Sequence, residues 1–331
     1  MDEWSKVKKV VIGTANQAMY PDGDCVGVRN VYYSDLHHDH LIPHGHYSQT
    51  IIDECNEDLE NLANVYKTFG AEVLRSNSTQ FTNCHSFVSP RDNITTIGNF
   101  VIASPMSINS RKNEWKNIPV KVTHNLTDSR FNENDYVDDC IMNKKFLATQ
   151  NYKPMWDAAN VLRAGRNILY LISNTGNLAG AHQLQEILGP KTEFKVHVLR
   201  DVYSYQHIDT TIALLEPGVV FANPSRIKSK AQLPKPMQNW DIIFAPEPTV
   251  QKWYGKHCMA SPWVNVNLVN LDEKTKIVEK DQIDTIKLLE KHKYTVIPVQ
   301  MKHSRSFGAG PHCATLEVER ECMLEWFFDK V

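Results

Sequence analysis

Ile168-Leu-Tyr-Leu-Ile172 is a short apolar run that leads through the segment Gly176–Leu188 to a second run, Phe194-Lys-Val-His-Val-Leu199. The two outer runs are rich in β-branched, aliphatic and aromatic residues, which is typical of strands. The middle segment has the length of a helix and ends at Gly189-Pro190, a pair that terminates helices. A strand, a helix and a second strand in this order predict an α/β fold, and the irregular strand pairs elsewhere favour a mixed sheet.

The same alternation continues through the rest of the chain. Two more segments have helical periodicity, Tyr47–Gly70 and Lys280–His292, and Ile283 of the second is expected to face inward. No linker or block of charge interrupts them, so we expect one domain over residues 1–331. The chain has no Gly-x-Gly-x-x-Gly or Walker A motif, and we expect no cofactor. Further predicted strands are Lys9–Ile12, Ile94–Ile97, Phe100–Ile102, Ile212–Leu215, Val219–Phe221, Asp241–Phe244, Val264–Val269, Tyr294–Val299 and Ala314–Val318.

The composition of the chain limits the classes of partner that the protein can bind. The 331 residues are 42% hydrophobic, which is enough for a sizeable core. Lys and Arg number 36 against 38 Asp and Glu, and no segment concentrates positive charge, which argues against nucleic acid. The apolar runs are far shorter than the roughly 18 residues of a membrane span. Seven scattered cysteines without a Cys-x-x-Cys pair, and a beginning without a signal-peptide core, predict reduced thiols and a cytoplasmic location.

A loop of small residues, Ser306-Phe-Gly-Ala-Gly-Pro-His-Cys-Ala-Thr315, leads into the last predicted strand. Gly308 and Gly310 let the backbone take conformations that a side chain forbids, and they let a substrate approach Cys313 closely. This favours an exposed, reactive thiol. The alternative is a tight turn with a half-buried structural cysteine, and the loop alone leaves both interpretations open.

Three further sites carry a histidine or a carboxylate. His207 and Asp209 are two residues apart on a segment expected to be extended, where both side chains project to one face. Such a pair suits a general acid/base and a cation anchor, although it also fits an ordinary surface pair. Asp157 stands alone in an apolar neighbourhood, where it orients a histidine or caps a turn. Asp92 precedes a strand, where it caps a turn or binds a cation.

Taken together and in this order, the motifs resemble the amidinotransferase family, whose best-known members move an amidino group from arginine to glycine or to an inosamine phosphate. The resemblance spans nearly the whole chain. The combination is highly specific, whereas no single motif is. The motifs are Asp2-Glu-Trp-Ser-Lys-Val-Lys-Lys-Val-Val-Ile-Gly13, Pro90-Arg-Asp92, Asp157-Ala-Ala with Arg163-Ala-Gly165, His207-Ile-Asp209-Thr-Thr, Asn223-Pro-Ser-Arg226 and His312-Cys313-x-Thr315.

The resemblance implies a fold and a set of roles. The fold is a five-bladed α/β propeller of ββαβ modules around a central active site. Family members are commonly dimers, so the resemblance also implies a homodimer. By this resemblance the nucleophile is Cys313, the general acid/base is His207, the carboxylate that orients it is Asp157, the guanidinium is held by Asp92 and Asp209, and the α-carboxylate of arginine is held by Arg226 and Ser261.

The chemistry of the family gives each residue type a reason. Arginine's guanidinium is delocalised and a poor electrophile, so two carboxylates must hold it planar and aimed at the nucleophile. A free thiol with a pKa near ~8.5 is mostly protonated at neutral pH, so a cationic substrate and an imidazolium must favour the thiolate. The resemblance implies a covalent amidino-Cys313, release of ornithine, and transfer of the amidino group to an amine.

Departures from the family pattern concern the acceptor. Ala309 replaces the middle one of three consecutive glycines, and Pro311 stands where an aromatic residue is frequent. Gln206 replaces the apolar residue that precedes the histidine in glycine-using enzymes, and Asn160 replaces an acid. We therefore expect an acceptor other than glycine. An amine intermediate of a specialised metabolite, such as a guanidinium toxin of the saxitoxin kind, is one example.

Other functions fit parts of the sequence. An arginine deiminase-like hydrolase uses the same cysteine, histidine and acidic pair but lets water resolve the intermediate. A metal-binding protein is suggested by Asp35-Leu-His-His-Asp-His40 and His44-Gly-His46, which place five histidines within His37–His46. Their spacing matches no standard zinc site, and the alternative is an exposed loop or the mouth of the active site. A catalytically inactive binding protein is disfavoured because every polar residue type of the site is present.

Overall fold

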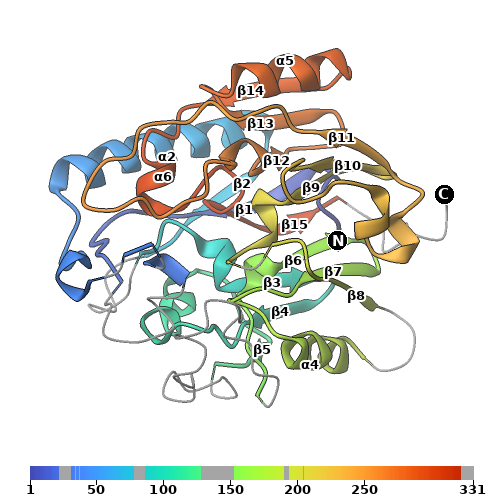
Figure 1. Cartoon of the computed structure of the whole chain (residues 1–331), viewed down its shortest axis with the longest axis horizontal. Coiled ribbons are helices and arrows are strands. Elements are labelled where there is room, and N and C mark those ends of the chain that lie inside the picture. Colours follow the sequence, from blue (N-terminus) through green and yellow to red (C-terminus); the bar gives the residue numbers. More distant parts are fainter. Residues whose placement is uncertain are drawn as a thin grey trace.

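The computed structural model describes most of the chain (Figure 1). It confirms the α/β class, with strands and helices that alternate along the described residues. No helix within them is both long and apolar enough to cross a membrane. The described residues are 1–21, 31–33, 35–36, 38–77, 86–127, 153–189, 194–203 and 205–321.

The strands of the described residues form five three-stranded sheets that share one topology. In each sheet the middle strand pairs antiparallel with one neighbour and parallel with the other. The sheets, in this strand order, are β15 (Thr315–Arg320), β1 (Val7–Ile12) and β2 (Glu72–Arg75); β3 (Ile94–Ile97), β4 (Phe100–Ala103) and β5 (His124–Asn125); β6 (Val161–Ala164), β7 (Asn167–Leu171) and β8 (Lys195–Leu199); β9 (Ile212–Glu216), β10 (Val219–Ala222) and β11 (Asp241–Phe244); β12 (Val269–Asn270), β13 (Thr275–Glu279) and β14 (Thr295–Val299).

Helices join the parallel strands in three of these sheets, which is the ββαβ order that the family resemblance implies. The connecting helices are α2 (Gln49–Phe69) between β1 and β2, α4 (Leu178–Leu188) between β7 and β8, and α5 (Ile283–Lys291) between β13 and β14. In Figure 1, α4 and α5 lie at opposite outer edges of the molecule. Between β4 and β5, and between β10 and β11, short 3-10 turns take the place of the helix in the described residues.

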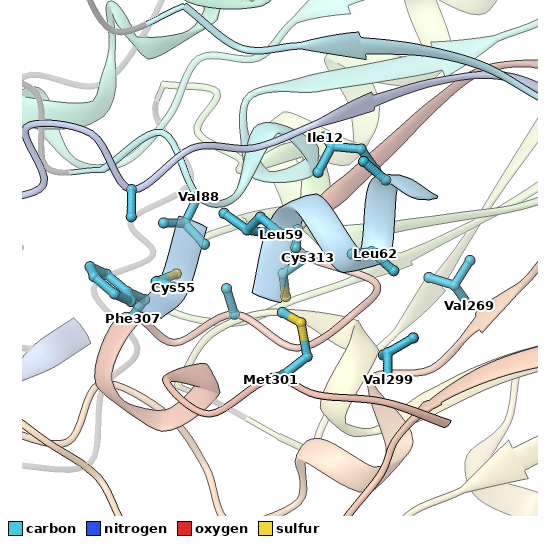
Figure 2. Close-up of a cluster of buried hydrophobic side chains, with 14 of the residues drawn as sticks. Ile12, Cys55, Leu59, Leu62, Val88, Val269, Val299, Met301, Phe307 and Cys313 are labelled. Atoms are coloured by element: carbon cyan, nitrogen blue, oxygen red, sulfur yellow. The ribbon is translucent and has the colours of Figure 1, made fainter. Parts of the chain in front are cut away.

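The helix α2 follows the predicted periodicity. Its buried face carries Ile52, Leu59 and Leu62, and the chain leaves the helix at Gly70, whose φ of 93° is a conformation that favours glycine. This face forms a hydrophobic cluster with β1 and with the loop that carries Cys313 (Figure 2). The loop that carries Cys313 is therefore anchored against a close-packed core.

One sheet joins segments that are far apart in the sequence. The strand β1 pairs with β15 in antiparallel register, with Val11 opposite Leu316 and Ile12 opposite Thr315. Because Cys313 lies two residues before β15, this pairing fixes the position of the thiol relative to the beginning of the described chain.

Two local predictions were wrong. Val264–Val269 was expected to be a strand, but Val264–Val266 forms a 3-10 turn, and β12 begins only at Val269. Ile283 was expected to face inward, but it is the first residue of α5 and its side chain is 50% exposed, while Leu289 is buried. At the first turn of a short helix, periodicity alone does not determine which face is covered.

Candidate active site

A short turn precedes the strand of each sheet that pairs antiparallel with the middle strand, namely β3, β6, β9, β12 and β15. The first four turns are 3-10 helices: η2 (Pro90–Asp92), η6 (Ala158–Asn160), η7 (Ile208–Thr210) and η10 (Val264–Val266). The fifth is the turn that holds Cys313. Among these turns, η2 contacts η6, η6 contacts η7, and η7 contacts η10. Residues in or beside the five turns make up the candidate site.

His207 lies between two carboxylates. Its Nε2 donates to Oδ2 of Asp157 at 3.0 Å, and its Nδ1 lies 3.6 Å from Oδ1 of Asp92. Burial alone would lower the pKa of His207, but Asp92 and then Asp157 raise this pKa to about 9. The predicted pairing of His207 with Asp157 is present. The segment is not extended, however, because His207 precedes a 3-10 helix that contains Asp209.

Asp92 is held from behind by a buried arginine. Nη1 of Arg111 donates to Oδ2 of Asp92 at 2.8 Å, and Arg111 also pairs with Glu114. The other oxygen of Asp92, Oδ1, is buried and has no hydrogen-bond partner among the described residues. Asp92, Arg111 and His207 line one small cavity of about 10 Å³ together with Tyr32. A buried carboxylate oxygen that lacks a donor suits a cationic ligand.

Cys313 is buried, so the predicted exposure of its thiol was wrong, and it faces the second carboxylate. Its Sγ lies 3.1 Å from Oδ2 of Asp209 and accepts a hydrogen bond of 3.0 Å from Nδ2 of Asn267. The same oxygen of Asp209 accepts from Nδ1 of His312 at 3.0 Å. Burial, followed by the charges of Asp209 and Asp92, raises the pKa of the Cys313 thiol well above its usual range. Although burial opposes it, the hydrogen bond from His312 helps to lower the pKa of Asp209 to about 2.

Arg226 and Ser261 also lie together as predicted. Nη2 of Arg226 donates to Oγ of Ser261 at 2.9 Å, and Nη1 donates to the carbonyl oxygen of Thr210 at 2.9 Å. The guanidinium carbon lies 3.4 Å from the ring centroid of Tyr203. Ser261 and Tyr203 line a second cavity of about 180 Å³. Because Thr210 adjoins Asp209, the cationic group of Arg226 lies beside the turn that carries one of the site carboxylates.

All seven predicted site residues therefore fall into three adjoining groups. The sequence analysis did not identify Arg111, Tyr203 or Asn267 as site residues, and it quoted His312 only as a neighbour of Cys313. Of these four, only His312 had a signal, since it stands inside the cysteine motif. The others approach the site through the folding of distant segments.

Two of the residues that depart from the family pattern, Asn160 and Gln206, lie at different positions relative to the cavities. The Nδ2 of Asn160 donates to the carbonyl oxygen of Leu171 and to Oγ of Ser173, both at 2.9 Å, and Asn160 lines neither of the two cavities described above. Asn160 therefore stabilises the turn η6 and has no place in a cavity that could bind the acceptor. Gln206, in contrast, lines both cavities, and its Nε2 donates to the carbonyl oxygen of Val31.

The histidine-rich segment does not assemble a metal site in the part of the chain that the structure describes. His37 lies outside the described residues. Across the described residues no group of three or more His, Cys, Asp or Glu side chains is placed to hold a metal ion. The rings of His38 and His40 are stacked with centroids 5.5 Å apart, and both residues are exposed.

The raised pKa of His207 predicts a pH-dependent stability. Its pKa of about 9 in the folded chain lies above the roughly 6.5 of an unfolded histidine, so the imidazolium stabilises the fold. This contribution is fully present below about pH 6.5 and is lost as the pH rises through 9. We expect the free energy of unfolding of wild type to fall over this window by on the order of 3 kcal/mol more than that of His207→Gln. Denaturant unfolding of both proteins at pH 6.5 and 9 measures the difference, and parallel declines would contradict the assignment.

Comparison with known proteins places this site in a family. No family model matches the chain. It is 32% identical to inosamine-phosphate amidinotransferase 1 of Streptomyces glaucescens, over 98% of this chain and 97% of that protein. It is 26% identical to the L-arginine:L-lysine amidinotransferase of Pseudomonas savastanoi pv. phaseolicola, over 98% of this chain and 94% of that protein.

A solved structure agrees with these relatives. An amidinotransferase of the saxitoxin biosynthetic pathway from Microseira wollei superposes with a TM-score of 0.79 at 25% identity, over 98% of both chains. Sequence identity above 30% along almost the full length of both chains, together with the common fold, establishes the relationship. The chain belongs to the amidinotransferase family.

Proposed function

We propose that the protein transfers the amidino group of L-arginine, through a covalent amidino-Cys313, to an amine acceptor and releases L-ornithine. One observation carries the proposal: a buried thiol touches one carboxylate, Asp209, while His207 lies between two others, Asp92 and Asp157. Such a pocket suits a cation that is to be attacked by sulfur. The similarity to an L-arginine:L-lysine amidinotransferase supports arginine as the donor.

The donor is proposed to lie with its guanidinium between Asp92 and Asp209. Oδ1 of Asp92 is buried without a partner among the described residues, and a guanidinium N–H supplies the donor that this oxygen lacks. The α-carboxylate is assigned to Arg226 and Ser261, which already contact each other. Arg226 presents a planar guanidinium stacked on Tyr203, a geometry that matches a carboxylate.

Substrate binding is proposed to activate the nucleophile. In the free protein the pKa of Cys313 is raised by burial and by neighbouring carboxylates, so the thiol keeps its proton. A guanidinium between Asp92 and Asp209 neutralises the charges that oppose the thiolate. Binding of arginine then lowers the pKa of Cys313, and the thiol proton is released to solvent. The thiolate forms only where there is a donor to attack.

His207 is proposed to serve as acid and then as base. With a pKa of about 9 it enters the first step as imidazolium at neutral pH. The thiolate sulfur bonds to the guanidinium carbon, the bond from this carbon to the ornithine nitrogen breaks, and His207 gives its proton to that nitrogen. Neutral His207 then takes a proton from the acceptor amine while this amine bonds to the amidino carbon and the carbon–sulfur bond breaks. Asp157 holds the ring by accepting from Nε2 throughout.

The acceptor is proposed to be an amine intermediate of a specialised metabolite rather than glycine. The second cavity lies next to the first, since Tyr32, Gln206 and Met259 line both. Its volume of about 180 Å³ is many times the roughly 10–15 Å³ that one water molecule needs, which leaves room for an acceptor larger than glycine. The match to an amidinotransferase of the saxitoxin pathway supports this class of acceptor.

We propose that residues 1–331 form one catalytic domain in which the five sheets are the blades of a propeller. The contacts from η2 through η6 and η7 to η10 support this closure. Asn267 joins η10 to the Cys313 turn, and Nε of Arg91 in η2 donates to the carbonyl oxygen of His312 at 2.9 Å, which completes a ring. A cytoplasmic location and a homodimer stay predictions.

The proposed intermediate is tested by mass spectrometry of the protein after incubation with arginine alone. We expect an amidino adduct on the peptide that contains Cys313, with one equivalent of ornithine released. An adduct on Cys258 or Cys322 would contradict the choice of nucleophile. Steady production of citrulline and ammonia without an acceptor would instead support the arginine deiminase-like hydrolase.

The proposed carboxylate clamp predicts donor specificity. Wild type should prefer arginine strongly over agmatine, which lacks the α-carboxylate. Arg226→Lys keeps the charge but loses the two-pronged geometry, so KM for arginine should rise by about tenfold or more with a smaller change in kcat. The variant should also lose most of the preference over agmatine. Steady-state kinetics with both donors measure these effects, and equal use of the two donors by wild type would exclude Arg226 from this role.

A further inference from the structure

The side chain of Asn267 is clamped in one orientation against the nucleophile. Its Oδ1 accepts from the backbone N–H of His312 at 3.0 Å and from that of Cys313 at 3.2 Å. A carbonyl oxygen cannot donate, so these two N–H groups determine which end of the amide is oxygen. The NH₂ group is therefore directed at Sγ of Cys313, to which Nδ2 donates at 3.0 Å.

We propose that Asn267 is a catalytic residue that stabilises the thiolate of Cys313 by this hydrogen bond, and that Gly310 is glycine in order to admit the Asn267 side chain. The inference rests on the proposed role of Cys313 as nucleophile. Asn267 is 1% exposed and Cys313 is 3% exposed, so water does not compete for the sulfur from the Asn267 side. In such a site a fixed donor favours a developing anion without reorganising.

An uncharged donor suits this position better than a lysine or arginine would. The sulfur already faces Asp209, which disfavours the thiolate, so some opposing interaction must stabilise it. A cationic side chain at position 267 would pair with Asp209 and compete with the guanidinium of the donor. The amide of Asn267 stabilises the sulfur anion but leaves the carboxylates free to bind the substrate.

Gly310 supplies the second observation. A Cβ atom at Gly310 would lie 2.5 Å from Oδ1 of Asn267 and 2.9 Å from its Cγ and Cβ, closer than real carbon atoms approach. Gly308 has a φ of 71°, a conformation that favours glycine, but Gly310 is not among the positive-φ residues. Space for Asn267, rather than backbone conformation, therefore explains the glycine at position 310.

The position of Asn267 in its module agrees with this role. It stands two residues before β12, as Asp92 stands two residues before β3 and Cys313 two residues before β15. In η10 the backbone N–H of Asn267 donates to the carbonyl oxygen of Val264, which directs the side chain out of the turn toward the cysteine loop. The sheet of β12 thus contributes a site residue from the same position, two residues before the strand, as the sheets of β3 and β15.

The test measures the ionisation of Cys313 directly. Protein is alkylated with iodoacetamide across a pH series, and modification of the Cys313 peptide is followed by mass spectrometry. We expect the midpoint for Asn267→Ala to lie about one pH unit or more above that of wild type. Turnover at neutral pH should fall in parallel and recover in part at higher pH. An unchanged midpoint in folded Asn267→Ala would overturn the inference.

A neighbouring asparagine provides the matched control. Asn265 is buried in the same turn, and its Nδ2 donates to the carbonyl oxygen of Pro246 at 3.0 Å and to Oγ1 of Thr285 at 3.2 Å. Asn265→Ala removes two hydrogen bonds and lowers the melting temperature, but the alkylation midpoint of Cys313 should stay at the wild-type value. If Asn265→Ala shifts the midpoint as much as Asn267→Ala does, general loosening of η10 explains both, and the inference fails.

Gly310→Ala completes a double-mutant cycle. Alone it should displace the Asn267 amide and raise the midpoint, as Asn267→Ala does. Combined with Asn267→Gly it should add little to the effect of Asn267→Gly alone, because all three atoms that a new Cβ would meet are then absent. Fully additive effects would overturn the explanation of Gly310.

The outcomes also separate this inference from the proposed function. If wild type forms no amidino adduct but Asn267→Ala shifts the midpoint, the transfer mechanism fails while the thiolate contact stands. If the adduct forms and the midpoint does not move, the role of Asn267 fails while the mechanism stands.

Discussion

Cys313→Ala is expected to release no measurable ornithine from arginine, the largest single effect that the site predicts. The substitution removes the only sulfur that contacts Asp209 and Asn267 among the described residues. It leaves every proposed anchor for arginine in place, and it removes a thiol rather than adding charge or bulk. Arginine should therefore still bind, as isothermal titration calorimetry would measure. Loss of turnover with retained binding distinguishes a missing nucleophile from a damaged pocket.

Cys55 offers a control for this experiment. It is a buried thiol in α2 whose pKa is raised by burial and then by Asp58, and it belongs to the same hydrophobic cluster as Cys313. Cys55→Ala should cost about 1 kcal/mol of stability and leave ornithine release near the wild-type rate. Normal turnover in Cys313→Ala, or loss of turnover in both variants, would contradict the mechanism.

Asp209→Asn is expected to have the second largest effect, with two consequences of opposite sign. Asp209 is one of the groups that raise the pKa of Cys313, so the amide should make the free thiol easier to ionise and faster to alkylate at neutral pH. Turnover at saturating arginine should nevertheless fall about 100-fold or more, because the guanidinium loses one of the two charges that hold it at the sulfur. Unfolding would also expose the thiol, speed its alkylation and slow turnover, so the two effects count only where the near- and far-UV circular dichroism of Asp209→Asn match those of wild type.

The measurements for Asp209→Asn are the alkylation rate of the Cys313 peptide and the kcat for ornithine release. A slower alkylation rate would show that Asp209 favours the thiolate rather than opposing it. Unchanged kcat with raised KM would assign Asp209 to binding alone, without a role in aiming the guanidinium.

The sequence was most informative where a pattern is local. The periodicity of Tyr47–Gly70 predicted α2 to within two residues, because a 21-residue amphipathic helix with a glycine at its end is specified by its own residues. The segment from Ile168 to Leu199 likewise predicted β7, α4 and β8. Asn177 begins α4 by accepting from the N–H of Gly180, a cap that adjoins the predicted start.

The arrangement of the site could be predicted only in part. The motifs include Cys313, His207 and Asp157, which lie near one another in the structure, yet nothing in their spacing indicates that a 3-10 turn lies at each carboxylate. Asn267 was missed because Val264–Val269 alternates like a strand, which would point its asparagines along one face. Steric and hydrogen-bonding requirements of the cysteine loop, about 45 residues later, favour a turn instead.

The roles of Arg91 and Arg163 could not be predicted from the motifs either. Arg91 and Arg163 stand in motifs that carry the family resemblance, but they contact no proposed ligand group. Nε of Arg91 donates to the carbonyl oxygen of Thr315 at 3.0 Å, and Arg163 pairs with Glu3 at 2.7 Å and with Glu317 at 3.0 Å. They support the strand that follows Cys313, a role that can be recognised only in the three-dimensional structure.

The pairing of β1 with β15 has a consequence for biosynthesis. The two strands lie roughly 300 residues apart in the sequence, whereas β6 to β8 and β9 to β11 assemble from neighbouring segments. Because closing a longer loop adds only a logarithmic entropy cost, the distant pairing limits the speed of folding more than its final stability. On the ribosome, the local sheets can form while β15 is still unmade, and Cys313 has no partner strand behind it. A nascent chain can therefore hold most of the described sheets, but the proposed nucleophile has no supporting strand until synthesis has passed β15.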